Sequence, residues 1–178
     1  MSNSISFKSQ SASERSGDIL VSFSSRWIDR LRGSSPKYIF RRRVPSSFVP
    51  RRVFVYVASP ISEIIGFFTV KKIQQIVLSD ALKISSEALI DVEELKKYFC
   101  GYDSVGCYIV QENLIFDEPI KLSELREHFV FFPPQSFVAL SDGSSDWIDK
   151  KSAEHPLRRS SSIQVDGTLR SGADESKI

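Results

Sequence analysis

Short runs of apolar residues predict that β-strands dominate this chain. The clearest run is Val53–Val57, where every residue is β-branched or aromatic and Pro60 follows closely; such residues favour strands. Tyr38 and Phe40 alternate with charged residues, which is typical of a strand with one solvent-exposed face. Strands are predicted at residues 19–23, 37–43, 53–57, 66–70, 105–110, 114–116 and 137–140.

Helical spacing of apolar residues occurs in fewer places. Trp27, Ile28 and Leu31 fall on one face of a predicted short helix that begins near Ser25 and ends at Gly33. Further helices are predicted at residues 80–89, 91–99 and 123–128. Because these helices are inserted late and do not alternate regularly with strands, we predict a strand-dominated α+β fold. Its expected form is a small β-barrel of five or six strands with flanking helices.

The two ends of the chain differ from its middle in composition. Residues 1–17 are rich in serine, and residues 141–178 contain few large apolar side chains. Such segments bury too little surface to offset the entropy lost on ordering. We therefore predict a disordered arm at 1–17, one domain at 18–140 and a mostly disordered tail at 141–178. Trp147 and Ile148 are the tail side chains expected to dock on the domain.

The residues that could bind a metal are few. Cys100 and Cys107 do not have the spacing of a zinc pair, and the only histidines are His128 and His155. We expect no metal site, no cofactor and no disulfide. No apolar run approaches the length of a membrane helix or a signal peptide, so we expect a cytoplasmic protein without a membrane partner.

Charge is distributed unevenly along the chain. Its formal net charge is only +2, yet nine lysines and arginines and a single acid, Asp29, lie between Arg26 and Arg52. A concentrated positive surface attracts polyanions and releases counterions when it binds phosphate. Tyr38 lies among these cations, and an aromatic surface beside phosphate donors suits unpaired bases. The alternative is that the arginines pair with the acidic residues of 80–127 or form a solvated face; Phe40 is expected in the core.

Five motifs in order resemble those of the ASCH domain, a branch of the PUA-like β-barrels. The first is Gly33–Arg42, which has a glycine, a lysine and arginines in a segment that follows the first strand and helix. The others are Arg41–Arg43 with Pro45, Tyr56–Pro60 with Ile65 and Gly66, Tyr98 and Phe99 with Gly101 and Tyr108, and Pro133–Phe137. Together they span about residues 19–140. The chain is most similar to stand-alone ASCH-domain predicted transcriptional regulators.

The chain departs from the ASCH motif at two positions. Ile39 stands where the family usually has a glutamate, and Phe40 stands where ASCH amidohydrolases acting on acetylated cytidine have a threonine. Lys37 matches the lysine of that motif. A phenyl ring cannot accept a proton, so we expect no such hydrolase activity. Lys37 is a candidate catalytic residue only if the chain is nevertheless an enzyme.

The resemblance and the charge pattern predict a non-catalytic nucleic-acid-binding module, with RNA or single strands favoured over DNA, that regulates transcription or translation. Lys37, Arg41, Arg42 and Arg43 are expected to contact phosphate, and Tyr38 to stack on a base. Lys37 and at least two of the three arginines should then surround one concavity. Two alternatives remain: a nucleoside- or nucleobase-modifying amidohydrolase of the ASCH type, and a protein-interaction domain whose basic face meets an acidic partner.

Overall fold

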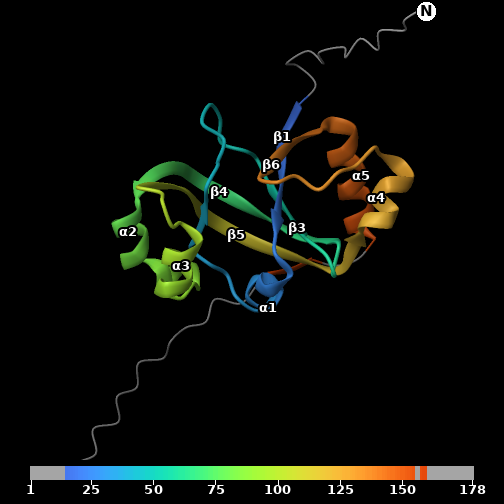
Figure 1. The fold of residues 1–178 in the computed structure, drawn as a ribbon. Helices are drawn as coiled ribbons and strands as arrows, with labels where there is room; N and C mark the ends of the chain where they lie inside the picture. The colour runs from blue at the N-terminus through green and yellow to red at the C-terminus, as the bar shows by residue number, and fades with distance from the viewer. Residues whose placement is uncertain (1–14, 155–156, 160–178) are drawn as a thin grey trace, which may run out of the picture.

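One mixed β-sheet forms the framework of the protein. The computed structural model describes residues 15–154 and 157–159. The strands lie in the order β2-β5-β4-β3-β1-β6, and β7 pairs separately with β5 (Figure 1). Only β1 and β3 are parallel, and the other pairs are antiparallel. The strands are β1 (Arg15–Phe23), β2 (Tyr38–Arg41), β3 (Val53–Val57), β4 (Glu63–Val77), β5 (Ser104–Lys121), β6 (Phe137–Ser141) and β7 (Leu157–Arg159).

The strand-dominated α+β class is confirmed, but the sheet is not closed into a barrel. Among the described residues, no pairing joins β2 to β6. The reason is the length of the β4–β5 ribbon. At one end of it, β3 pairs with Glu63–Phe68 of β4. At the other end, β2 pairs with Gly106–Ile109 of β5, which lies opposite Lys72–Gln75. The two edges of the sheet are therefore displaced along the ribbon and do not meet.

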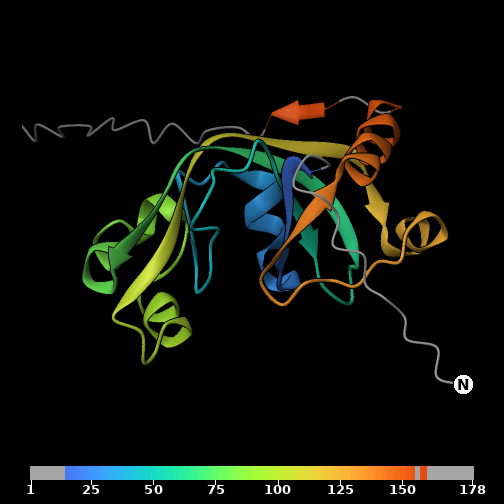
Figure 2. The same cartoon turned by 90° about the horizontal axis from the view of Figure 1, so that it is seen from above.

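Helices cover both ends and the middle of this ribbon (Figures 1 and 2). They are the 3-10 helices η2 (Ser25–Trp27) and η3 (Ser85–Ala88), and the α-helices α1 (Ile28–Gly33), α2 (Leu78–Lys83), α3 (Val92–Tyr98), α4 (Leu122–His128) and α5 (Asp142–Ala153). Figure 2 shows α2 and α3 at one end, α4 and α5 at the other, and α1 between them. No helix in the described part of the chain has the length and apolar character needed to span a membrane.

The central strands are buried on both faces. In β1, Ile19 and Val21 belong to a cluster that includes Leu31 of α1, whereas Leu20 packs on the opposite face with Ile148 of α5. All five residues of β3 are buried as well. This is why Val53–Val57 is a continuous apolar run rather than an alternating one. A third cluster, which contains Phe40 and Leu95, joins β2 to the helices α2 and α3.

Helix α5 occupies the start of the segment 141–178, for which the sequence predicts a mostly disordered tail. The side chain of Ser141 caps the helix by accepting a hydrogen bond from the backbone N–H of Ser144. Ile148 is buried and Trp147 packs beside it, as expected for these two residues. Strand β1 likewise begins at Arg15, before the predicted boundary at residue 18. The disorder predicted for residues 1–14, 155–156 and 160–178 lies outside the described residues.

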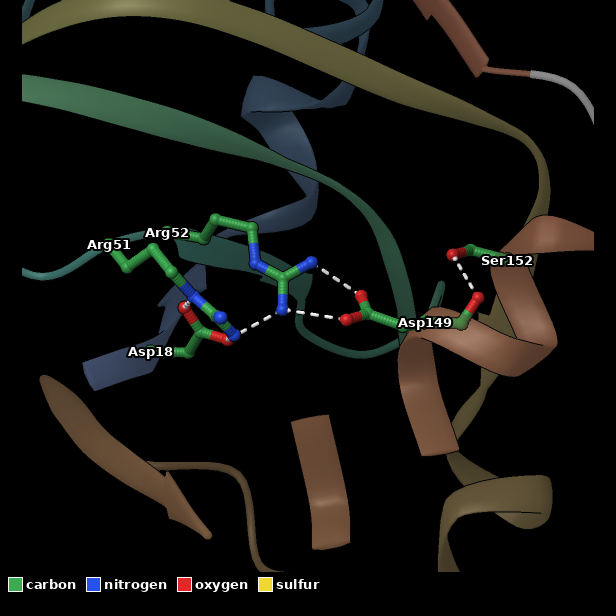
Figure 3. A network of polar contacts seen from close by, with 5 residues as sticks. All are labelled: Asp18, Arg51, Arg52, Asp149 and Ser152. Carbon is green, nitrogen blue, oxygen red and sulfur yellow. Dashed lines mark hydrogen bonds and ion pairs between the residues drawn. The ribbon is translucent and has the colours of Figure 1, made fainter. Parts of the chain in front are cut away.

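Ion pairs fasten α5 to the sheet. Arg52 lies between Asp149 of α5 and Asp18 of β1 and donates hydrogen bonds to both carboxylates (Figure 3). Arg51 donates two further bonds to Asp18, at 3.0 and 2.7 Å. Burial acts to raise the pKa of Asp18, but the hydrogen bonds and charges of the two arginines outweigh burial and lower it below its ordinary value. These contacts help to hold a helix that has few apolar residues.

Candidate functional site

A cavity of about 240 Å³ opens beside β2. One wall is β2 itself, from Tyr38 to Arg41, and Ser22 at the end of β1 adjoins it. The facing walls come from η2 and α1, which supply Arg26, Trp27 and Arg30, and from α3, which supplies Glu94 and Tyr98. Gln135, in the segment before β6, also lines the cavity. Segments far apart in the sequence therefore meet here.

Arg41 is the half-buried cation of this cavity. Its guanidinium donates a hydrogen bond of 2.8 Å to the backbone carbonyl of Ser22 and lies 5.0 Å from the ring centroid of Phe23. Burial lowers the pKa of Arg41, although the neighbouring phenols of Tyr98 and Tyr108 act in the opposite direction. In the part of the chain that the structure describes, no carboxylate pairs with this guanidinium. An anionic ligand would supply the missing counter-charge.

Ser22 contributes its backbone carbonyl to this wall, as the acceptor of the hydrogen bond from Arg41. Its Oγ is buried and has no hydrogen-bond partner among the described residues. Because side chains alternate along a strand, this hydroxyl lies on the face of Leu20 and not on the face of Phe23, which lines the cavity, so it is not available to a ligand there.

Besides Arg41, a pair of arginines faces the cavity from η2 and α1. The guanidinium groups of Arg26 and Arg30 lie 5.2 and 4.8 Å from the ring centroid of Trp27. Both also pair with Glu94 of α3, at N–O distances of 3.5 Å for Arg26 and 3.1 Å for Arg30. The ring and the carboxylate together hold these two side chains in place.

Tyr38 is the half-buried aromatic residue of the cavity lining that no guanidinium covers among the described residues. It stacks on Phe40 with ring centroids 6.4 Å apart and an interplanar angle of 7°. Phe40 is buried, which confirms the prediction that it belongs to the core. The rings of Trp27 and Tyr98, in contrast, lie beneath arginines. Tyr38 is thus the cavity ring best placed to stack on a ligand.

The predicted site residues are only partly brought together. Tyr38 and Arg41 line the cavity, whereas Lys37, Arg42 and Arg43 do not. The prediction that Lys37 and two of the arginines surround one concavity is therefore wrong.

Contacts with other residues hold Lys37 and Arg42 outside the cavity. The ammonium of Lys37 lies 2.7 Å from Glu87, and the hydrogen bond and charge of Glu87 raise the pKa of Lys37. Arg42 donates a hydrogen bond of 2.6 Å to the carbonyl of Tyr98 and lies over the rings of Tyr98 and Tyr102. Arg43 is exposed.

Three residues that line the cavity were not predicted from the sequence as site residues: Arg26, Arg30 and Glu94. A signal for the arginines was present, because residues four apart lie on one face of a helix. Nothing comparable marked Glu94, which lies in the acidic region and reaches the cavity only through the tertiary fold. Within residues 15–154 and 157–159, no group of three or more His, Cys, Asp or Glu side chains is arranged to hold a metal ion.

The fold and the cavity define an α+β protein with one bent sheet and an arginine-lined pocket. No protein-family model matches the chain. An ASCH domain-containing ribonuclease of Zymomonas mobilis subsp. mobilis is 25% identical over 130 residues, which are 70% of this chain and 80% of that protein.

Solved structures share the fold. The crystal structure of the ASCH protein of Zymomonas mobilis has a TM-score of 0.68 at 23% identity and covers 75% of this chain and 94% of that chain. A mutant of that protein, with alanine in place of a serine, has a TM-score of 0.70 at 21% identity over 78% and 98% of the two chains. The N-terminal domain of Staphylothermus marinus McrB has a TM-score of 0.54 at 11% identity over 77% and 95%. The predicted resemblance to ASCH-domain proteins is thereby confirmed.

Proposed function

We propose that this ASCH protein binds single-stranded RNA and that the cavity beside β2 receives one nucleotide. The observation that carries the proposal is Arg41, a half-buried cation whose hydrogen-bond acceptor among the described residues is a neutral carbonyl. A phosphate supplies both the charge and the acceptor oxygens that a guanidinium binds most strongly. The cavity is small, which suits a single nucleotide rather than a duplex.

Recognition of a base would fall to Tyr38. Its ring lines the cavity and is backed by Phe40, so its position is fixed by packing. Stacking on an aromatic ring is worth on the order of 1–3 kcal/mol per base and tolerates any base. An unpaired nucleotide can present its face to such a ring, whereas a base within a helix is already stacked.

One observation favours RNA over DNA: the similar protein from Zymomonas mobilis is named a ribonuclease. We also propose a regulatory role in transcription or translation, a cytoplasmic location and an acidic protein partner.

RNA cleavage in the same cavity is the second candidate function, favoured by the name of that similar protein. Attack of a 2′-oxygen on the adjacent phosphorus releases a 5′-hydroxyl and leaves a 2′,3′-cyclic phosphate. It needs one group to take a proton and another to donate one. The carboxylate of Glu94 can accept a proton and the phenols of Tyr38 and Tyr98 can donate one, while arginines stabilise the charge on phosphate. The structure adds no support for the amidohydrolase alternative, because Lys37 lies outside the cavity.

The binding proposal is tested by fluorescence polarisation with single- and double-stranded RNA and DNA across a salt series. We expect Arg41→Gln to weaken single-stranded RNA binding by tenfold or more, since hydrogen bonds to charged groups contribute about 1.5–3 kcal/mol. The salt slope should fall by about one. Arg43→Gln is the matched control, because it removes the same charge from an exposed site outside the cavity. Equal losses for the two variants would show that only overall charge matters.

Cleavage is tested on the same RNA with and without a single 2′-deoxy substitution, with products resolved on gels. Tyr38→Phe and Tyr98→Phe keep the rings and remove the hydroxyls. If the cavity cleaves RNA, the deoxy position resists and at least one of these variants loses cleavage while keeping its affinity. Intact RNA after prolonged incubation with the wild-type protein would leave binding as the function.

A further inference from the structure

Glu94 occupies an unusual position for an acid in a cavity that attracts anions. Its Oε1 lies 3.5 Å from Arg26, and its Oε2 lies 3.1 Å from Arg30 and accepts a hydrogen bond from it. The carboxylate is partly shielded, with 25% of the side chain exposed, whereas the two arginine side chains are 56% and 44% exposed. All three residues line the cavity. One carboxylate thus neutralises part of a two-arginine site.

The two arginines have the geometry of a phosphate-binding pair. Both guanidinium groups lie against the ring of Trp27, so their positions do not depend on Glu94 alone. Guanidinium groups bind carboxylate and phosphate oxygens in the same way, through parallel N–H donors. An anion that displaced Glu94 would find both arginines already near their binding positions.

The cavity therefore contains two anion-binding positions, of which one has no acidic partner among the described residues and the other is occupied by Glu94. At the first, Arg41 has no acidic partner among the described residues and can accept a phosphate directly. At the second, Arg26 and Arg30 are paired with Glu94. A ligand phosphate can bind there only if it replaces the carboxylate, so this position discriminates among ligands.

We infer that Glu94 holds the place of a ligand phosphate in the free protein and limits binding to ligands that can displace it. The inference rests on the proposed RNA binding. The ligand class is an oligonucleotide with at least two phosphates, one at Arg41 and the next at Arg26 and Arg30. Glu94 is then a specificity-determining residue, because a ligand with one phosphate fills the position at Arg41 and leaves Glu94 in place.

The test compares Glu94→Gln with Glu93→Gln. Glu93 precedes Glu94 in the first turn of α3, pairs with Lys96 and does not line the cavity, so the control removes the same charge from the same helix turn. Asp91 caps the helix through the backbone N–H groups of both residues, which neither substitution removes.

We expect Glu94→Gln to bind a labelled single-stranded RNA oligonucleotide about three- to tenfold more tightly than Glu93→Gln, since partly exposed ion pairs are individually weak. Its salt slope should be steeper by about one, because freed arginines recruit counterions that RNA then releases. Adding Arg30→Gln to Glu94→Gln should abolish the gain. Affinity equal to or weaker than that of the control would overturn the inference.

Inorganic phosphate, titrated against both variants and followed by NMR chemical shifts, separates this inference from the proposed function. If neither variant binds RNA but Glu94→Gln binds phosphate more tightly than Glu93→Gln, the displaced-carboxylate site stands and RNA binding is wrong. If both variants bind RNA equally and phosphate equally, RNA binding stands and the role of Glu94 is wrong.

Discussion

Replacing Asp18 with asparagine tests how much the ion-pair network between the sheet and α5 contributes to stability. The Asp18 side chain is 0% exposed and accepts three hydrogen bonds from Arg51 and Arg52. Asparagine keeps the shape but removes the negative charge and points an amide N–H₂ toward guanidinium donors. The variant therefore isolates the electrostatic contribution of the network in Figure 3.

The expected loss of unfolding free energy depends on the contacts that Arg51 and Arg52 retain in the variant. Removing one partner of a buried ion pair typically costs about 3–5 kcal/mol of unfolding free energy. Arg51 is 59% exposed and can be rehydrated, which reduces the cost. Arg52 is only 15% exposed, but it retains Asp149. We therefore expect Asp18→Asn to lose roughly 2–4 kcal/mol, or roughly 4–16 °C in Tm for a chain of this size.

Urea denaturation measures this loss, with the unfolding free energies extrapolated to water. Asp146→Asn is the control, because Asp146 is an exposed acid on the same helix, and such surface changes are worth about 0.5 kcal/mol or less. Asp149→Asn should fall between the two, since the Asp149 side chain is 44% exposed. If Asp18→Asn matches Asp146→Asn, the buried charge of Asp18 adds nothing to stability and the electrostatic argument fails.

Three further predictions concern stability. The pKa of Asp18 is lowered from its ordinary value of 3.8, so its contribution is full above about pH 4 and is lost as pH falls through the lower folded value; denaturation of wild type and Asp18→Asn should converge there. Gly66→Ala should prevent folding, as judged by circular dichroism, because a Cβ would lie 2.1 Å from the carbonyl oxygen of Leu114. Truncation after Ser141 should lower Tm, since it removes Ile148; an unchanged Tm would make α5 dispensable.

The sequence predicted where the buried strands lie, because burial determines their composition, but it did not predict the lengths of β4 and β5. Val53–Val57 was predicted with its observed bounds, since a strand buried on both faces must be apolar throughout. The open form of the sheet was not predictable in the same way. It depends on where β2 pairs along β5, and on register shifts in β4 between Thr69 and Lys72 that leave no compositional mark.

The docking of α5 and the make-up of the cavity also depend on contacts between residues far apart in the sequence. The contact between Arg52 and Asp149 joins residues 97 positions apart, and no local pattern marks such a pair. Tyr38 and Arg41 were predicted as site residues from alternation and charge, and both line the cavity. Lys37 was predicted from the same pattern, but Glu87, 50 positions away, pairs with its ammonium.

Most of the nine cations between Arg26 and Arg52 are not available to bind a ligand. Six of them pair with carboxylates: Arg26, Arg30, Arg32, Lys37, Arg51 and Arg52. No acid pairs with Arg41, Arg42 or Arg43 within the described residues, and of these only Arg41 lines the cavity. Because the salt slope of binding counts the phosphates neutralised, it should reflect one or two phosphates rather than nine. In the proposed RNA binding, affinity then depends on the cavity, through Arg41 and the ring of Tyr38.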